Sequence, residues 1–491
     1  MSEKAEFLTD AKALLGERGL TTDGELVEPW LTDWRGRYTG RAMALASPAS
    51  TPEVAALVKL CARHGVPIVP QGGNSGMSGG ATPDASGTAI VLSLRRMNAV
   101  RRFDADAMQI TCDAGVVLQT LHETVEPKGL RFPLTLGGKG SATVGGLIST
   151  NAGGTQVLRH GAMRAQVLGL EAVMADGSVF DSLKALKKDN RGFDLKQLLI
   201  GSEGTIGIVT AATLRLVPAI ADRAVLWCGL GDIRTARKLL VHAQREAGDA
   251  LEGFEVMPRH SLRAVLAHEP SARSPLQSEH EWHALVELIG DRSGADGLSD
   301  TASALLEAAF AAELIEDATI AASDTQAEQF WAIRDGISAA ERALGPAMQH
   351  DISVPVPDMA DFVAETVPRV EERFTGTKAI AFGHLGDGNV HFHVLAPEGA
   401  PRGEWEESEG KTISAFVHDE VTRWGGSISA EHGIGQMKRD ELARLADPVH
   451  IAILRQVKQA LDPQGLLNPG KLIAQHDASD GTPLAQGATT L

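Results

Sequence analysis

The sequence has little cysteine and no long apolar run. Its three cysteines, Cys61, Cys112 and Cys228, are far apart. This spacing suits neither a disulfide framework nor a CxxC metal site, and it predicts buried free thiols in a reducing compartment. No stretch reaches the roughly 18 apolar residues of a membrane span, and the acidic start MSEKAEFLTD lacks the features of a secretory signal. We therefore expect a cytoplasmic protein without a membrane span.

Positive charge is also in short supply. The chain has 46 lysines and arginines against 63 acidic residues, which gives a formal net charge of −17. This balance argues against nucleic acid or an anionic membrane as the main partner. It does not exclude a small anionic substrate, because such a molecule responds to the local field of its binding site.

The chain is too long for one hydrophobic core, so its 491 residues predict several domains. Short β-rich runs alternate with helices up to Pro218, and amphipathic helices are common after it, which predicts an α+β fold. We expect a helical lead-in at residues 1–40, a first domain at 41–218, a second domain at 219–424, a closing segment at 425–475 and a disordered tail at 476–491.

Glycine is abundant, with 52 residues gathered in a few blocks. The first block, QGGNSGMSGG at residues 71–80, follows a short apolar strand, and its small residues let consecutive backbone N–H groups converge on one anion. It matches neither GxGxxG nor the Walker pattern. Taken alone, it suits a flexible turn and a phosphate-binding loop equally well. Two further blocks, at residues 132–154 and 199–210, favour an extended cofactor with a pyrophosphate.

These three blocks, in this order, resemble the two-subdomain FAD-binding domain of the vanillyl-alcohol oxidase / p-cresol methylhydroxylase type. The resemblance implies that the first block wraps the pyrophosphate, the second runs towards the isoalloxazine and the third closes over the adenine side. No histidine lies between Val66 and Gly80, so the FAD is expected to be non-covalent. The implied cofactor contacts are Gln71, Gly72, Gly73, Asn74, Ser75, Gly76, Pro133, Thr135, Gly138, Ser141, Gly145, Asn151, Gly153, Glu203 and Ile206.

Two histidine clusters lie in glycine-bracketed segments of the second half. In GHLGDGNVHFH the central GDG is a turn signal, so His384 and His391 are expected on adjacent strands of a hairpin. His391 and His393 are two apart and share one side of a strand. In SAEHGIG, Glu431 precedes His432. Two imidazoles and a carboxylate suit a catalytic divalent ion, whereas a lone histidine is most simply a hydrogen-bonded core or surface residue.

The second half also resembles the FAD-linked D-2-hydroxy acid dehydrogenases, through GHLGDGNVH, SAEHGIG and LDPQGLLNPGKL. The similarity is closest to the D-2-hydroxyglutarate dehydrogenases and extends to D-lactate dehydrogenases and glycolate oxidase flavoprotein subunits. It implies an α+β substrate (cap) domain and a helical C-terminal segment that completes the active site. The implied metal ligands for Zn²⁺ or a similar ion are His384, His391 and Glu431; His432 is the implied catalytic base, and Asn468 the implied contact near the flavin ring.

The same resemblance implies a substrate site around Arg334, whose guanidinium would bind a substrate carboxylate in a bidentate manner. Without the resemblance, Arg334 would be an ordinary helix-surface arginine. Two positions depart from the family pattern, because Gln349 stands where a lysine is usual and His393 where an asparagine is common. The missing lysine removes a cation for a second carboxylate, for which His393 or His350 would compensate in part. Gln349 and His350 suit plain strand residues equally well. The implied substrate contacts are Arg334, Ser338, Gln349, His393 and His432.

The implied reaction is oxidation of a D-2-hydroxy acid, with D-2-hydroxyglutarate as first candidate, to the 2-oxo acid. A divalent ion lowers the hydroxyl pKa, a histidine accepts the proton, and the Cα hydride passes to flavin N5. A separate acceptor such as electron-transfer flavoprotein or a quinone would take the electrons, and the family is compatible with a homodimer. The alternatives are a D-lactate dehydrogenase, a glycolate oxidase subunit, a non-redox flavoprotein of the ether-lipid synthase kind, and a non-catalytic flavin- or metal-binding protein.

Overall fold

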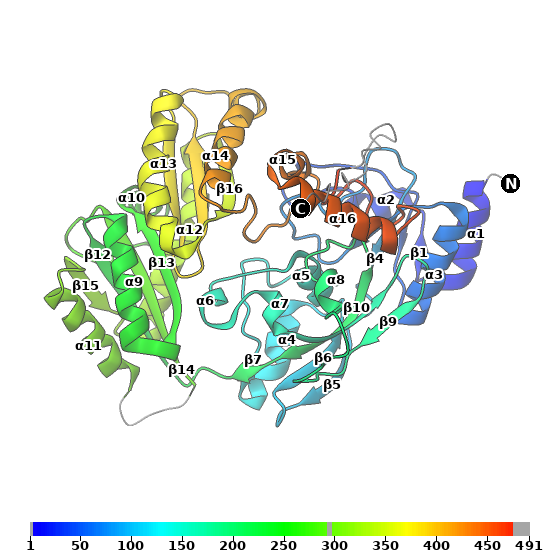
Figure 1. Ribbon diagram of the computed structural model, residues 1–491, viewed down its shortest axis with the longest axis horizontal. Coiled ribbons are helices and arrows are strands. Elements are labelled where there is room, and N and C mark those ends of the chain that lie inside the picture. Colours follow the sequence, from blue (N-terminus) through cyan, green and yellow to red (C-terminus); the bar gives the residue numbers. More distant parts are fainter. Residues whose placement is uncertain (1–2, 292–296, 475–491) are drawn as a thin grey trace, which may run out of the picture.

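The computed structural model describes residues 3–291 and 297–474, so the tail predicted at 476–491 lies outside the described residues. Figure 1 shows two bodies side by side, the first built from the first half of the chain and the second from the middle of the chain. The last two helices, α15 (Arg439–Leu445) and α16 (Pro448–Leu461), lie against the first body. This mixture of helices and sheets confirms the predicted α+β class.

Three sheets make up the first body. A four-stranded sheet has the order β1-β2-β4-β3, and a five-stranded antiparallel sheet has the order β5-β6-β10-β8-β9. The third sheet is the short pair of β7 and β11. The strands are β1 (Leu20–Thr21), β2 (Ala44–Ala46), β3 (Ile68–Gln71), β4 (Ile90–Ser93), β5 (Val100–Asp104), β6 (Gln109–Asp113), β7 (Leu130–Arg131), β8 (Val167–Val173), β9 (Val179–Ser182), β10 (Ile208–Arg215) and β11 (Val217–Pro218).

The helices of the first body are short apart from two that pack on the four-stranded sheet. In α3, the side chain of Ser50 accepts a hydrogen bond from the N–H of Glu53, and Gly65 ends the helix in the left-handed conformation. Its apolar side joins the core of this body. The helices are α1 (Glu3–Leu15), α2 (Gly24–Val27), α3 (Thr51–His64), α4 (Leu118–Val125), α5 (Val144–Thr150), α6 (Val157–His160), α7 (Met163–Gln166) and α8 (Lys196–Leu199).

The second body is one seven-stranded antiparallel sheet, of order β15-β12-β14-β13-β17-β18-β16, with helices on both faces. Its strands are β12 (Asp222–Leu230), β13 (Leu251–Pro258), β14 (Trp282–Gly290), β15 (Asp317–Ile320), β16 (Ala347–Ser353), β17 (Lys378–His384) and β18 (Asn389–Leu395). Its helices are α9 (Ile233–Ala247), α10 (Arg259–His268), α11 (Leu298–Ala311), α12 (Asp324–Leu344), α13 (Met359–Arg373) and α14 (Lys411–Arg423).

Strand alternation divides this body into two cores. Ala379 and Ala381 of β17 pack with α9, α11, α13 and α14 on one face. Ile380 and Phe382 point the opposite way and pack with α10 and α12. The histidines of the hairpin belong to the second face, which therefore carries the site described below.

The closing segment returns the chain to the first body. Leu467 forms a parallel bridge with Ile68, and the Asn468 N–H donates to the Ile68 carbonyl oxygen at 2.8 Å. The segment thus extends the edge of the four-stranded sheet at β3, directly before the first glycine block.

The three cysteines are buried and free, as predicted. Burial raises the pKa of each thiol to about 12, which makes them unreactive at neutral pH. None of the described helices is long and apolar enough to cross a membrane.

Candidate active site

A cavity of about 690 Å³ lies where the three glycine blocks of the first body meet. Among the described residues, no backbone N–H from 73 to 80 donates a hydrogen bond, so the first block presents a run of free amides, as an anion site requires. The cavity is lined by these predicted cofactor contacts: Gln71, Gly72, Gly73, Asn74, Ser75, Gly76, Gly138, Ser141, Gly145, Gly153 and Glu203.

The first two blocks pack so closely that side chains are excluded between them. A Cβ at Gly73 would lie 1.7 Å from the Ser141 carbonyl oxygen, and one at Gly72 would lie 2.4 Å from the Thr143 hydroxyl. Glycine at these positions lets the backbone close around the cavity. The volume, in the usual range of cofactor sites, and the free amides fit FAD.

The remaining predicted cofactor contacts do not line the cavity, as far as the described residues show. Asn151 instead ends α5, and its Oδ1 accepts a hydrogen bond from the Arg164 N–H at 2.9 Å. The Asn468 amide donates to the carbonyl oxygens of Gly80 and Glu203 at 2.9 and 2.7 Å. It therefore links the closing segment to the first and third glycine blocks. The residues outside the lining are Pro133, Thr135, Asn151, Ile206 and Asn468.

The first turns of α5 also line the cavity, and Gly145 is the residue of this helix that was predicted from the sequence to do so. Thr143 is the N-cap of this helix, and its hydroxyl accepts from the Gly146 N–H. The signal available in the sequence was the run of small residues in the second block. The lining residues missed there are Thr143, Gly146, Leu147, Ser149 and Thr150.

Glu203 joins the third block to the loop that carries the catalytic candidates. Its carboxylate accepts hydrogen bonds from the N–H groups of Ile434 and Gly435 at 2.7 and 2.8 Å. The residue itself is in the left-handed conformation, with φ of 53°. Burial raises the pKa of its carboxyl. Glu203 therefore connects the cavity wall to the SAEHGIG loop, in addition to facing the cavity.

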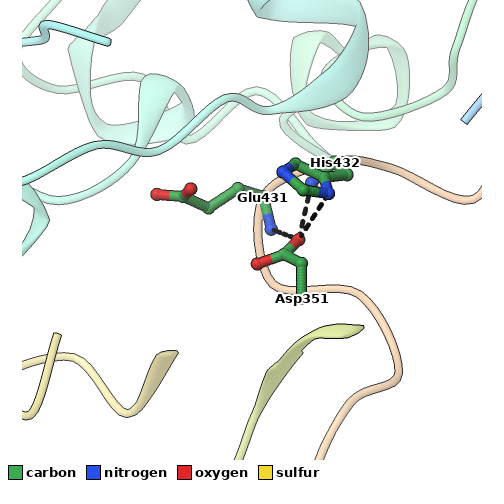
Figure 2. Close-up of side chains that lie close together, drawn as sticks. All are labelled: Asp351, Glu431 and His432. Carbon is green, nitrogen blue, oxygen red and sulfur yellow. Dashed lines mark hydrogen bonds and ion pairs between the residues drawn. The ribbon is translucent and has the colours of Figure 1, made fainter. Parts of the chain in front are cut away.

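Asp351, at the edge of the seven-stranded sheet, holds the other side of that loop (Figure 2). Its Oδ2 accepts hydrogen bonds from the N–H groups of Glu431 and His432 at 2.9 and 3.0 Å. The same oxygen lies 3.5 Å from His432 Nδ1. No role was predicted for Asp351 from the sequence. The signal available there was an aspartate directly before the apolar end of a strand, in DISVP.

His432 and Glu431 both line the cofactor cavity. Burial lowers the pKa of His432 to about 4, against the opposing effect of Asp351, so its imidazole is neutral at pH 7. Burial raises the pKa of Glu431 to about 7. The predicted base is thus in its basic form and beside the cofactor cavity.

The predicted hairpin is confirmed. His384 ends β17 and His391 lies in β18, the two strands pair antiparallel, and the ring centroids are 5.5 Å apart. His391 and His393 share the face that α12 covers, as predicted from their spacing, because both rings lie 5.1 Å from the ring of Phe382.

Arg334 of α12 is not a surface residue. Its Nε donates to Glu255 Oε2 at 2.8 Å, and Nη2 lies 3.1 Å from His384 Nε2. Glu255 Oε1 also accepts from His384 Nδ1 at 2.5 Å. Burial of Glu255 is outweighed by Arg334 and His384, which lower its pKa to about 2. The buried carboxylate of Glu255 therefore balances the charge of Arg334, the residue predicted to bind a substrate carboxylate.

Further along α12, the same face holds a second buried pair. Glu341 is fully buried, and its carboxylate accepts from His393 Nδ1 at 2.6 Å and from the Ser261 hydroxyl at 2.9 Å. Gln349 lies opposite His393 in the paired strands, and its buried side-chain nitrogen has no partner among the described residues. Ser338 lies on α12 one turn after Arg334.

Of the two interpretations of His350, the structure agrees with the plain strand residue and not with a substrate contact. His350 points to the other face of the sheet, because neighbouring residues of a strand alternate. Its Nδ1 bonds to the Phe392 carbonyl oxygen at 2.8 Å and its Nε2 to the Ser414 hydroxyl of α14 at 2.9 Å.

The predicted metal ligands are not assembled into one site. His384 and His391 are neighbours, but both ring nitrogens of His384 are engaged by Glu255 and Arg334. The Glu431 carboxylate points away from Asp351 (Figure 2), and its Oε1 is 3.2 Å from where a Cβ at Gly153 would lie. Among the described residues, the group whose ligand atoms lie within 4.8 Å of one another is Asp351, Glu431 and His432.

Comparisons with known proteins agree with this geometry. Residues 42–182 match the family described as "FAD binding domain", and residues 220–472 match "FAD linked oxidases, C-terminal domain". In fold, the chain is similar to the crystal structure of p-cresol methylhydroxylase with substrate bound, with a TM-score of 0.74, 15% identity, and coverage of 96% of this chain and 98% of that one.

Three relatives span nearly the whole chain. It is 36% identical to the mitochondrial D-2-hydroxyglutarate dehydrogenase of Arabidopsis thaliana, over 94% of this chain and 80% of the relative. It is 36% identical to the D-2-hydroxyglutarate dehydrogenase of Xanthomonas citri pv. viticola, over 94% and 96%. It is 34% identical to a D-2-hydroxyglutarate–pyruvate transhydrogenase of Saccharomyces cerevisiae, over 90% and 88%. The chain therefore belongs to the family of FAD-linked oxidoreductases that contains the D-2-hydroxyglutarate dehydrogenases.

Proposed function

We propose that this protein oxidises a D-2-hydroxy acid, with D-2-hydroxyglutarate as its substrate, to the corresponding 2-oxo acid. The observation that carries the proposal is that His432, a neutral imidazole, lines the same cavity as the free amides of residues 73–80. A proton acceptor is therefore placed beside the site that fits the flavin. The names of the relatives support the choice of substrate.

The chain's own residues account for binding and proton removal. The amides of residues 73–80 would hold the FAD pyrophosphate, and bound FAD supplies the acceptor for the Cα hydride. Asp351 beside Nδ1 of His432 favours the tautomer with its proton on Nδ1, which leaves Nε2 to take the proton of the substrate hydroxyl. Arg334, held by Glu255, keeps further N–H donors for a substrate carboxylate.

A divalent metal requirement is a separate part of the proposal. Two imidazoles whose ring centroids are 5.5 Å apart, together with the Glu431 carboxylate, are residue types that suit Zn²⁺, and His384 would exchange its contacts with Glu255 and Arg334 for the ion. His384, His391 and Glu431 would hold the ion, which would lower the pKa of the substrate hydroxyl. Elemental analysis of the purified protein, before and after dialysis against a chelator, tests this part independently of turnover.

The proposal also includes the electron acceptor that reoxidises the flavin. A separate electron-transfer flavoprotein or a quinone is the first candidate. The yeast relative is named a transhydrogenase with pyruvate, which supports a 2-oxo acid as a second candidate. Reoxidation of the anaerobically reduced enzyme by each class in turn distinguishes them.

The experiment for the reaction itself is anaerobic flavin reduction. D-2-hydroxyglutarate, D-malate, D-lactate and glycolate are added in turn to the purified flavoprotein while the oxidised-flavin absorbance is followed. Bleaching by a D-2-hydroxy acid and not by its L-enantiomer is expected. Failure of every hydroxy acid to bleach a fully loaded flavin would refute the proposed function and favour a non-redox or non-catalytic flavoprotein.

A further inference from the structure

A loop of the first body that runs from Thr32 to Thr39 holds a tryptophan, Trp34, at the cofactor cavity. Thr32 and Thr39 form a bridge across the base of this Trp34 loop. Inside the loop, the Asp33 carboxylate accepts a hydrogen bond from the Tyr38 N–H at 2.5 Å, and the Tyr38 carbonyl oxygen accepts one from the Asp33 N–H at 3.0 Å. The backbone that bears Trp34 is therefore held by the loop itself.

The indole of Trp34 is an unusual part of the cavity wall. Trp34 lines the cavity, and yet 60% of its surface is exposed. Within the described lining, the aromatic rings are those of Trp34 and His432, and most of the rest is glycine, short polar residues and aliphatic side chains. A large aromatic ring that faces a cavity with most of its surface uncovered suits contact with a flat ring of a ligand.

The Trp34 loop is attached to the first glycine block at two points. The Asn74 side chain donates to the Thr32 carbonyl oxygen at 2.8 Å. At the other end of the block, a Cβ at Gly79 would lie 2.7 Å from Tyr38 Cδ2 and 2.8 Å from Gln436 Nε2. The Gln436 amide also donates to the Gly79 carbonyl oxygen at 2.9 Å. The Trp34 loop and the residue that follows the SAEHGIG loop therefore meet at Gly79.

The same end of the block is attached to His432. The Ser78 hydroxyl contacts the carbonyl oxygens of His432 and Gly433 at 3.1 and 3.0 Å, within donating distance of both. The loops that bear Trp34 and His432 are thus fastened to neighbouring residues, Gly79 and Ser78. Both side chains therefore belong to one end of the cavity.

The chemistry of alcohol oxidation fixes which ring of FAD belongs at that end. The hydride leaves Cα and the proton leaves the hydroxyl on the same carbon, so the two acceptors must flank one small group. Since His432 is the proposed proton acceptor, the isoalloxazine belongs at the His432 end of the cavity. The adenine is separated from it by the pyrophosphate and cannot occupy the same place.

We propose that Trp34 stacks on the isoalloxazine of bound FAD and shields that ring from water. This rests on the proposed function, because the role of His432 decides where the ring lies. An indole is flat and rich in electrons, whereas oxidised isoalloxazine is poor in them, so the two rings are complementary in shape and in charge distribution.

The test uses apoprotein reconstituted with FAD and needs no substrate. An indole in contact with flavin quenches its fluorescence by giving an electron to the excited ring, which a phenyl ring or an alkyl group does not do. Trp34→Phe and Trp34→Leu should therefore both raise the fluorescence of bound flavin several-fold. Trp34→Phe keeps a ring for stacking and should keep FAD affinity near the wild-type value, whereas Trp34→Leu should weaken it roughly two- to tenfold.

Trp30→Phe is the matched control. Trp30 lies four residues earlier, packs with Val27 and Leu45, has the Arg95 guanidinium 4.9 Å from its ring centroid, and is outside the described lining. This variant should leave flavin fluorescence and FAD affinity unchanged. The melting temperature of the apoprotein should stay the same in both Trp34 variants, because a largely exposed side chain contributes little to stability.

Each result decides the proposal. Unchanged flavin fluorescence in the two Trp34 variants, an equal rise in Trp30→Phe, or a loss of FAD affinity that accompanies a lower apoprotein melting temperature would overturn it. If no hydroxy acid bleaches the flavin although the Trp34 variants behave as expected, the proposed reaction fails and the contact stands. If hydroxy acids bleach the flavin and the Trp34 variants fluoresce like wild type, only the role of Trp34 fails.

Discussion

The Asp351 carboxylate accepts a hydrogen bond from the backbone N–H of His432 at 3.0 Å. This bond joins the edge strand of the seven-stranded sheet to the loop that reaches the flavin cavity (Figure 2). Asp351 therefore helps to set the position of the catalytic candidate relative to the substrate residues, while Glu203 holds the same loop to the cavity wall.

Replacing Asp351 with asparagine should slow flavin reduction about ten- to hundredfold, because a charge-assisted hydrogen bond contributes about 1.5–3 kcal/mol. The asparagine oxygen can still accept from both N–H groups of the loop, but without the negative charge, and its NH2 group then faces the Asn389 amide nitrogen that donates to Asp351 Oδ1 at 2.9 Å. Stopped-flow absorbance under anaerobic conditions measures the rate. Asp361→Asn, an exposed residue on α13, should be without effect. Unchanged flavin reduction in Asp351→Asn would exclude the positioning role.

His432→Gln should reduce the rate of flavin reduction by roughly 10²–10⁴-fold, the usual contribution of a general base. FAD should remain bound, because most of the cavity lining comes from the glycine blocks of the first body. Since burial lowers the pKa of His432 to about 4, the wild-type kcat/KM should not fall between pH 8 and pH 6 through this group. A decline centred near pH 6.5 would show that the imidazole has its ordinary pKa.

Two glycine variants separate loop packing from cofactor contact. Gly73→Ala places a Cβ 1.7 Å from the Ser141 carbonyl oxygen, so it should lower both the melting temperature of the apoprotein and FAD affinity. At Gly76 an added Cβ meets no protein atom within 4 Å, although this residue lines the cavity. Gly76→Ala should therefore leave the apoprotein's melting temperature unchanged and weaken FAD binding about tenfold or more. Equal behaviour of the two variants would contradict the placement of the pyrophosphate.

Glu252 joins the two bodies through a buried ion cluster. Its carboxylate contacts Arg131 at 2.5 Å and Arg159 at 2.9 Å and is 2% exposed. Glu252→Gln should lower the free energy of unfolding by about 3–5 kcal/mol, the usual effect of breaking a buried pair. Glu279→Gln, which breaks an exposed pair with Arg263, should cost less than about 1 kcal/mol.

The Glu252 effect should depend on pH in a defined direction. Its burial is outweighed by His160, Arg131 and Arg159, which hold the pKa of this carboxyl well below its usual range. Because the folded-state pKa lies below the unfolded value of about 4.3, the stabilisation is complete above that value and is lost as the pH falls below it. Urea denaturation should show a constant difference between wild type and Glu252→Gln from pH 8 to pH 6 and a smaller one near pH 3. A difference that grows on acidification would contradict this assignment.

The pair of His393 and Glu341 gives a fifth prediction. His393→Asn leaves the fully buried Glu341 with Ser261 as its remaining hydrogen-bond donor, so stability should fall by about 3–5 kcal/mol. Adding Glu341→Gln removes the uncompensated charge and should restore most of the loss. The two unfolding free energies, measured in a double-mutant cycle, check this. Additive losses in the double variant would show that the two side chains do not act as a pair.

Local patterns were sufficient for much of the site. The spacing of His384 and His391 about a GDG turn predicted adjacent strands, because a tight turn and strand alternation leave few other arrangements. The glycine block at residues 71–80 predicted close backbone approach, because small residues alone permit it. The family resemblance added the roles of Arg334 and His432, which composition and spacing could not assign.

Only the tertiary structure decided which charges face which. Glu255, Glu341 and Asp351 come from β13, α12 and β16, so no local pattern links them to Arg334, His393 and His432. Sequence determines a strand's faces and a turn's shape through nearest-neighbour sterics, whereas pairing of buried charges depends on long-range packing. That packing brings Asp351 against the loop of Glu431 and His432.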